Sequence, residues 1–207
     1  MRVAPEQTDE SLLRRARAGD ESAFAALYRR RQGALYRFAL QMSGSESVAE
    51  DATQEVFMSL LAAAHGFDAA KGSLSSYLYG AARNQVLRRL EKDKAYVALA
   101  DEDEEAAARG DKFSQARQDP LAELARGETV ETVRQAVLAL PLHYREVVVL
   151  CELQEMSYAE AACALGCAVG TVRSRLHRAR SLLVERLKDL DGWEEPAGDF
   201  DAARCFA

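Results

Sequence analysis

Residues 157–180 have the sequence SYAEAACALGCAVGTVRSRLHRAR, which predicts two short helices joined by a turn. The first helix begins with a capping box, in which the Ser157 hydroxyl accepts from the backbone N–H of Glu160 and the Glu160 carboxylate accepts from the backbone N–H of Ser157. Gly166 ends this helix, and the second begins near Gly170 and Thr171. Short helices separated by turn signals are typical of a helix-turn-helix.

The second helix has two chemically different faces. At about 100° per residue with Val172 at zero, a set of apolar residues falls within about 60° of Val172 and predicts the buried face. These residues are Leu176, Ala179, Leu183, Leu187 and Leu190. The opposite face carries Arg173, Ser174, His177 and Arg178, with Arg175 and Arg180 at its two borders.

The polar face of this helix suits a polyanion. From Val169 to Val184 the chain has four arginines and no acidic residue, whereas a merely solvated face usually interleaves acids at three- and four-residue spacing. The major groove of DNA admits an α-helix, and arginine bridges the O6 and N7 acceptors of guanine. We therefore favour DNA recognition over a solvated arginine-rich surface.

The rest of the chain also has a helical composition. Of its 207 residues 48% are hydrophobic, while Gly and Pro number only 12 and 4. This composition favours helices and argues against an all-β fold. We expect an all-α protein with two helical domains joined by a flexible acidic linker, the C-terminal one containing the helix-turn-helix. Capping residues and apolar repeats predict further helices that begin near Asp9 or Ser11, at Asp20, near Ser45 or Ser47, and at Ser73.

Charge and periodicity divide the chain into four parts. The net charge of −6 comes from two acidic stretches, one containing residues 101–105 and the other forming residues 189–207. Both have the composition of solvated connectors or tails. Periodicity is poor until Asp119-Pro120, a helix-start pair. The predicted parts are a first domain over 1–95, a linker over 96–119, a helix-turn-helix domain over 120–188 and a tail over 189–207.

The sequence favours a cytoplasmic location. Met1 to Ser11 lack the apolar core of a secretory signal, and the longest uncharged stretches are too short to span a bilayer. We expect no membrane insertion of this chain. The four cysteines are then more typical of reduced thiols than of a disulfide framework.

No pattern of catalytic residues stands out. The three histidines lie far apart, and the chain has no Gly-rich phosphate loop, no His-Glu-x-x-His helix and no nucleophile elbow. We therefore expect no enzymatic activity, no cofactor and no metal. Zinc is the alternative to test, since Cys163 and Cys167 can share a helix face with Cys151 nearby.

These motifs resemble the bacterial sigma factors of the extracytoplasmic-function (ECF) group, which direct RNA polymerase to promoters. Val169–Arg180 resembles the recognition helix of that family, and Ser157–Glu160 resembles the start of its helix-turn-helix. In the N-terminal half, Gln54–Phe57 resembles the segment that docks on the largest polymerase subunit. Tyr77-Leu78 followed by Ala82–Asn84 resembles the part that opens and reads the minus-10 element.

The resemblance implies a sigma factor that binds core RNA polymerase and promoter DNA and directs promoter-specific initiation. The implied minus-35 contacts are Thr171, Arg173, Ser174, Arg175, His177, Arg178 and Arg180. The implied minus-10 contacts are Lys71, Ser73, Tyr77, Arg83, Asn84 and Arg88. The implied polymerase contacts are Asp51, Gln54, Glu55 and Phe57. An anti-sigma factor is a further expected partner.

Two other functions compete with this one. A stand-alone helix-turn-helix regulator, which binds duplex operators as a dimer, would explain residues 129–188 but leave the N-terminal motifs unused. A helical adaptor that binds only protein would use the acidic helix around Asp51 and Glu55. A transcription assay with core polymerase separates all three.

Overall fold

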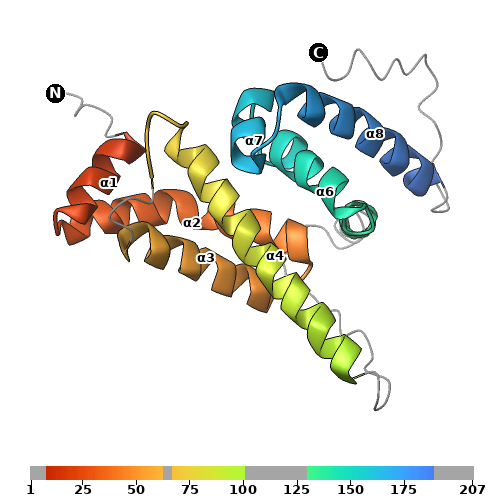
Figure 1. Cartoon of the computed structure of the whole chain (residues 1–207), viewed down its shortest axis with the longest axis horizontal. Helices are drawn as coiled ribbons and strands as arrows, with labels where there is room; N and C mark the ends of the chain where they lie inside the picture. Colours follow the sequence, from red (N-terminus) through yellow and green to blue (C-terminus); the bar gives the residue numbers. More distant parts are fainter. Residues whose placement is uncertain (1–7, 63–66, 101–129, 189–207) are drawn as a thin grey trace, which may run out of the picture.

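The computed structural model describes residues 8–62, 67–100 and 130–188, with side chains described as far as Lys92 in the second range. Within these ranges the chain folds into helices and turns without a β-strand (Figure 1). The predicted all-α class is confirmed. We call residues 8–100 the N-terminal unit and residues 130–188 the C-terminal unit.

The N-terminal unit starts with α1 (Asp9–Arg17) and α2 (Glu21–Ser43). The N-cap of α1 is Thr8, whose hydroxyl accepts from the Ser11 backbone, so neither Asp9 nor Ser11 caps this helix as we predicted. The Asp9 side chain is instead buried and pairs with Arg30 of α2, because a buried carboxylate needs a charged partner. Asp20 caps α2 as predicted, by accepting from the backbone N–H of Ala23.

Two longer helices complete the N-terminal unit. These are α3 (Glu46–Ala62) and α4 (Leu74–Ala100), which Ser73 caps by accepting from the backbone of Ser76. Apolar side chains of α2, α3 and α4 meet in a core that includes Leu35, Val56 and Val86, each at most 1% exposed. Because α4 continues to Ala100, residues 96–100 of the predicted linker are helical, and its remainder, 101–119, lies outside the described residues.

The C-terminal unit begins with a helix over residues 130–138. Next come α6 (Leu142–Val148) and the π-helical turn η1 (Val149–Leu153), then α7 (Tyr158–Leu165) and α8 (Val169–Lys188). The predicted capping box of Ser157 and Glu160 is present at the start of α7. Gly166 ends α7 with φ 63°, in the left-handed region that favours glycine. The predicted helix-turn-helix is therefore confirmed as α7 and α8.

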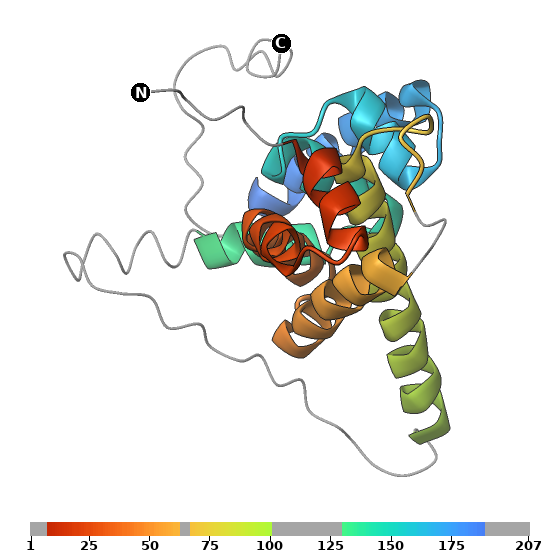
Figure 2. The ribbon, with the colours of Figure 1, turned by 90° about the vertical axis from the view of Figure 1, so that its left-hand side faces the viewer.

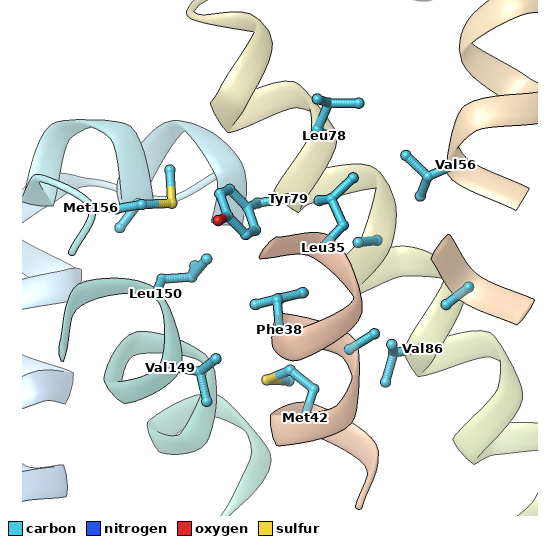
Figure 3. Close-up of a cluster of buried hydrophobic side chains, with 14 of the residues drawn as sticks. Leu35, Phe38, Met42, Val56, Leu78, Tyr79, Val86, Val149, Leu150 and Met156 are labelled. Carbon is cyan, nitrogen blue, oxygen red and sulfur yellow. The ribbon is translucent and has the colours of Figure 1, made fainter. Parts of the chain in front are cut away.

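The two units pack against each other through a shared apolar core. Figure 3 shows Phe38 and Met42 of α2 and Tyr79 of α4 facing Val149 and Leu150 of η1. Figure 2 shows the C-terminal half of α4 extending away from this body. The N-terminal half of α4 lies against α7, so the first turns of α4 form part of the contact between the two units.

Candidate nucleic-acid and polymerase-binding surfaces

The inner face of α8 holds the helix on the C-terminal unit. Val172, Leu176 and Ala179 are at most 1% exposed, which confirms the buried face that the sequence periodicity predicts. Leu183 and Leu187 are half-buried, and Leu190 lies outside the described residues. The buried stripe fixes the rotation of α8 and so determines which side chains face solvent.

The outer face of α8 presents the predicted minus-35 residues. Arg173, Ser174, His177 and Arg178 are all exposed, whereas Thr171 and Arg175 are half-buried at the border. The Cζ atom of Arg173 lies 5.9 Å from the ring centroid of Tyr158 on α7, a cation–π contact that ties the first turns of the two helices together. The four exposed side chains therefore share the solvent side of α8, and the major groove of DNA admits an α-helix.

Arg180 differs from the other predicted minus-35 residues because it faces inward. Its Nε donates to a carboxylate oxygen of Glu152 at 3.2 Å, and its Nη2 contacts the same oxygen. Only 27% of the Arg180 side chain is exposed. This pair links α8 to η1, so the cation already has an anionic partner within the chain.

Four of the predicted minus-10 residues lie around one hollow. Lys71, Ser73, Tyr77 and Asn84 line a pocket of about 440 Å³ at the start of α4. Phe67 also lines this pocket and meets the Tyr77 ring edge-on, with 5.7 Å between ring centroids. Aromatic faces beside ammonium and amide donors are suited to an unstacked base and its phosphate.

The other two predicted minus-10 residues lie outside this pocket. Arg88 is exposed further along α4. The Nε of Arg83 donates to a carboxylate oxygen of Glu146 on α6 at 2.6 Å. Glu146 is 2% exposed, and no pattern in the sequence marks it as the partner of an arginine 63 positions away.

The four residues of the predicted polymerase surface lie on α3, where three of them are exposed and the fourth is buried. Gln54, Glu55 and Asp51 are exposed, and Asp51 pairs with Arg89 of α4 at 2.8 Å. Phe57 is 3% exposed and its ring lies 4.7 Å from that of Tyr28, centroid to centroid. Phe57 therefore holds α3 against α2 and does not face a partner.

Sequence reasoning missed two exposed apolar side chains on the same helix. Met58 is 58% exposed and Leu61 is 41% exposed. They follow Gln54 at i+4 and i+7, which places all three on one face of α3. The spacing of these residues could have predicted this surface. Large apolar residues that share a helix face with exposed polar residues mark a surface that another protein can cover.

The cysteines were the basis of the zinc alternative. In the described part of the chain no group of three or more His, Cys, Asp and Glu residues is arranged to hold a metal ion. The Cys163 thiol instead donates to the backbone oxygen of Lys71 at 3.2 Å. Burial raises the pKa of the Cys151 thiol to about 11, and the charge of Glu152 acts in the same direction.

None of the described helices has the length and apolar character that a membrane span requires.

These features define a helical protein with an exposed arginine-bearing helix in one unit and a pocket lined by polar and aromatic side chains in the other. Comparisons with known proteins agree. Residues 27–96 match the family model of sigma-70 region 2, and residues 131–183 match that of sigma-70 region 4. The ECF sigma factor SigW of Bacillus subtilis is 32% identical over 182 residues, covering 86% of this chain and 96% of SigW. SigM of Mycobacterium tuberculosis is 36% identical over 184 residues, covering 88% of this chain and 86% of SigM.

Solved structures show the same likeness. The sigma factor RpoE of Bartonella quintana, in complex with the anti-sigma factor NepR, has a TM-score of 0.64 and 27% identity over 82% of this chain and 98% of RpoE. CnrH, in complex with the cytosolic domain of CnrY, also has a TM-score of 0.64 and 27% identity, over 89% of this chain and 99% of CnrH. The chain belongs to the ECF sigma factors of the sigma-70 family. It directs promoter-specific transcription initiation by RNA polymerase, and the stand-alone regulator is not favoured.

Proposed function

We propose that the C-terminal unit reads the minus-35 element through the outer face of α8. The observation that carries this proposal is that Arg173, Ser174, His177 and Arg178 are all exposed on a helix whose opposite face is buried. Arginine donors at the start of a helix in the major groove reach guanine edges, while half-buried Thr171 and Arg175 lie where the helix border meets phosphates.

We propose a separate role for the N-terminal unit, which is to capture the minus-10 strand. In this proposal a flipped base enters the pocket of about 440 Å³ and stacks on the Tyr77 ring, while Lys71 neutralises the adjoining phosphate. Arg88 extends this surface along α4. Arg83 joins it once its contact with Glu146 is released.

The proposed polymerase contact is the face of α3 that carries Gln54, Glu55, Met58 and Leu61. A surface of this kind combines apolar area for burial with carboxylates for orientation, which suits a basic protein partner. Asp51 contributes through its exposed carboxylate, which Arg89 holds in place. Phe57 supports this face from beneath.

A further proposed partner is an anti-sigma factor. Support comes from the two solved relatives, each of which was captured in a complex: RpoE with the anti-sigma factor NepR, and CnrH with the cytosolic domain of CnrY. Affinity purification of the chain from its native host, followed by mass spectrometry, would detect such a partner. We also propose that the chain acts in the cytoplasm and has no catalytic activity of its own, because its role is to direct RNA polymerase, which performs the catalysis.

The test is reconstituted transcription. Core RNA polymerase with the purified full-length chain should start RNA at defined positions on a genomic promoter library, and either component alone should not. Arg178→Ala should reduce these transcripts, whereas Arg186→Ala, which removes an equally exposed arginine from the last turns of α8, should leave them near the unmodified level. DNA binding without polymerase, with no defined start sites, would support the operator-binding alternative. Polymerase binding without DNA recognition would support the adaptor.

A further inference from the structure

The outer face of α8 and its border carry arginines without an acidic partner. In the part of the chain that the structure describes, Arg173, Arg175 and Arg178 form no ion pair. Arg175 and Arg178 are three residues apart on the helix, a spacing at which like charges repel. Arg180 differs, because Glu152 neutralises it. An anionic partner would therefore relieve the repulsion on this face whether or not DNA is present.

One apolar side chain interrupts the outer face near the end of α8. Val184 is 45% exposed. At about 100° per residue it lies within roughly 20° of both Arg173 and His177, so the three side chains point to the same side of the helix. Val184 thus provides an apolar contact point between the arginines and the end of the helix.

Residues 189–207, which lie outside the described residues, follow directly after α8 in the sequence. Six acidic residues and one arginine give this segment a net charge of −5. The acidic residues are Asp189, Asp191, Glu194, Glu195, Asp199 and Asp201. Among them stands Trp193, the one tryptophan of the chain. The segment therefore complements the outer face of α8 in both charge and apolar content.

The length of this segment allows its acidic residues to reach the arginines of the same helix. Arg178 lies about 15 Å along the axis from the end of α8, and Arg173 about 22 Å. At roughly 3.3 Å per residue, an extended chain brings Glu194 up to about 20 Å and Asp201 up to about 43 Å from that end. A segment tethered in this way acts at an effective concentration on the order of millimolar. The other acidic stretch, residues 101–105, is joined to the end of α4 instead.

We propose that residues 189–207 fold back on the outer face of α8 and compete with DNA for its arginines. Trp193 covers Val184, and the carboxylates that follow pair with Arg178 and Arg173. Each exposed ion pair is weak and screened by salt, so the contact is reversible and strengthens as the ionic strength falls. Random DNA is thereby excluded, whereas a cognate element adds base contacts and displaces the segment. The competition rests on the proposed minus-35 role of α8, but the contact itself does not.

Fluorescence of the full-length chain tests the contact without DNA or polymerase, because all tryptophan emission comes from Trp193. Acrylamide, a neutral quencher, should quench Trp193 less at low ionic strength than at high ionic strength. Arg178→Gln and Val184→Ala should each raise the quenching at low ionic strength towards the high-salt level.

The matched controls remove an exposed arginine and an exposed valine from other places. Arg29→Gln lies on α2 and Val169→Ala at the opposite end of α8, and both should behave as the unmodified chain does. The proposal is overturned if quenching does not depend on ionic strength. It is also overturned if Arg178→Gln and Val184→Ala leave the quenching unchanged.

Binding of the full-length chain to random duplex DNA tests the competition. Two variants each lose four negative charges. The tail variant carries Glu194→Gln, Glu195→Gln, Asp199→Asn and Asp201→Asn, and the linker variant carries Asp101→Asn, Glu102→Gln, Asp103→Asn and Glu104→Gln. By fluorescence anisotropy at low ionic strength, the tail variant should bind about tenfold more tightly, as expected when a millimolar tethered competitor with a dissociation constant of about 0.1 mM is removed.

The linker variant should bind DNA as the unmodified chain does. Equal gains in the two variants would reduce the effect to net charge and overturn the proposal. A gain in the linker variant alone would assign the face to the other acidic stretch, which overturns it as well.

The two measurements separate this proposal from the minus-35 role of α8. If Trp193 is protected, but the tail variant gains no DNA affinity and Arg178→Ala leaves promoter transcripts unchanged, the contact stands while the competition and the minus-35 role fail. If Arg178→Ala reduces transcripts and Trp193 is quenched equally in all variants, the minus-35 role stands and this proposal fails.

Discussion

Arg180 of α8 and Glu152 of η1 form an ion pair in which both side chains are about three-quarters buried, with 27% and 25% of their surfaces exposed. Pairing in partly desolvated surroundings strengthens the attraction between the two charges relative to a pair in open water. The contact therefore joins the recognition helix to the segment beneath it.

A double-mutant cycle measures this contact. Arg180→Ala and Glu152→Ala should show a coupling free energy on the order of 1 kcal/mol in urea unfolding. The matched pair is Arg134 with Glu131, which lie three residues apart on one helix and are more exposed, and should couple by about 0.5 kcal/mol or less. Equal coupling in the two cycles would show that burial adds nothing to the pair at Arg180.

The same pair alters what Arg180 does on DNA. Arg175→Ala should reduce the slope of log affinity against log salt by about one, because an arginine that contacts a phosphate releases one counterion when it binds. Arg180→Ala should reduce it by clearly less, since Glu152 already neutralises that charge. Fluorescence anisotropy with promoter DNA and the holoenzyme across a salt series gives both slopes. A full unit lost at Arg180 would show that this residue leaves Glu152 and contacts a phosphate.

Arg173 is expected to read a base. Arg173→Ala should weaken binding to cognate minus-35 DNA by roughly 1 to 3 kcal/mol and relax the preference at one base position. Competition binding against single-base variants of the site measures this preference. Equal loss on cognate and random DNA would show that Arg173 contacts only the backbone.

Phe57 and Met58 are neighbours on α3 with opposite roles. Phe57→Ala should lower the free energy of unfolding by about 3 to 5 kcal/mol, because it empties a buried ring site between α2 and α3. Met58→Ala should change it by less than about 0.5 kcal/mol and should weaken binding to core polymerase. Urea unfolding and polymerase pull-down test the pair. A stable Phe57→Ala variant would contradict the packing role.

Cys151 gives the stability of the chain a dependence on alkaline pH. The folded-state pKa of about 11 lies above the ordinary value of 9.0, so the protonated thiol stabilises the fold fully below pH 9. That contribution is lost as the pH rises towards 11, because the unfolded state releases the proton first. Urea unfolding at pH 8 and pH 10 should show a larger loss for the unmodified chain than for Cys151→Ala. Identical losses would refute the shifted pKa.

Local sequence features determined the helices and their ends. Asp20, Ser157 and Gly166 act within three or four residues of themselves, through a cap, a capping box and a left-handed turn. The exposed face of α8 was predictable for the same reason, since the spacing of Val172, Leu176 and Ala179 repeats with the helix. These interactions are complete within one segment, so the sequence alone specifies them.

The partners of single side chains were decided by the tertiary structure. Arg83 meets Glu146 across 63 positions and Arg180 meets Glu152 across 28, and neither distance has a periodic signature in the chain. Phe57 faces inward with Val56 and Leu60, as the apolar spacing of α3 indicates, and the docking of α3 on the aromatic rings of α2 leaves it buried and not available as the polymerase contact that the family resemblance implied. The sequence thus determined which faces exist, whereas the docking of distant helices decided which charges and rings on those faces are still free to bind a partner.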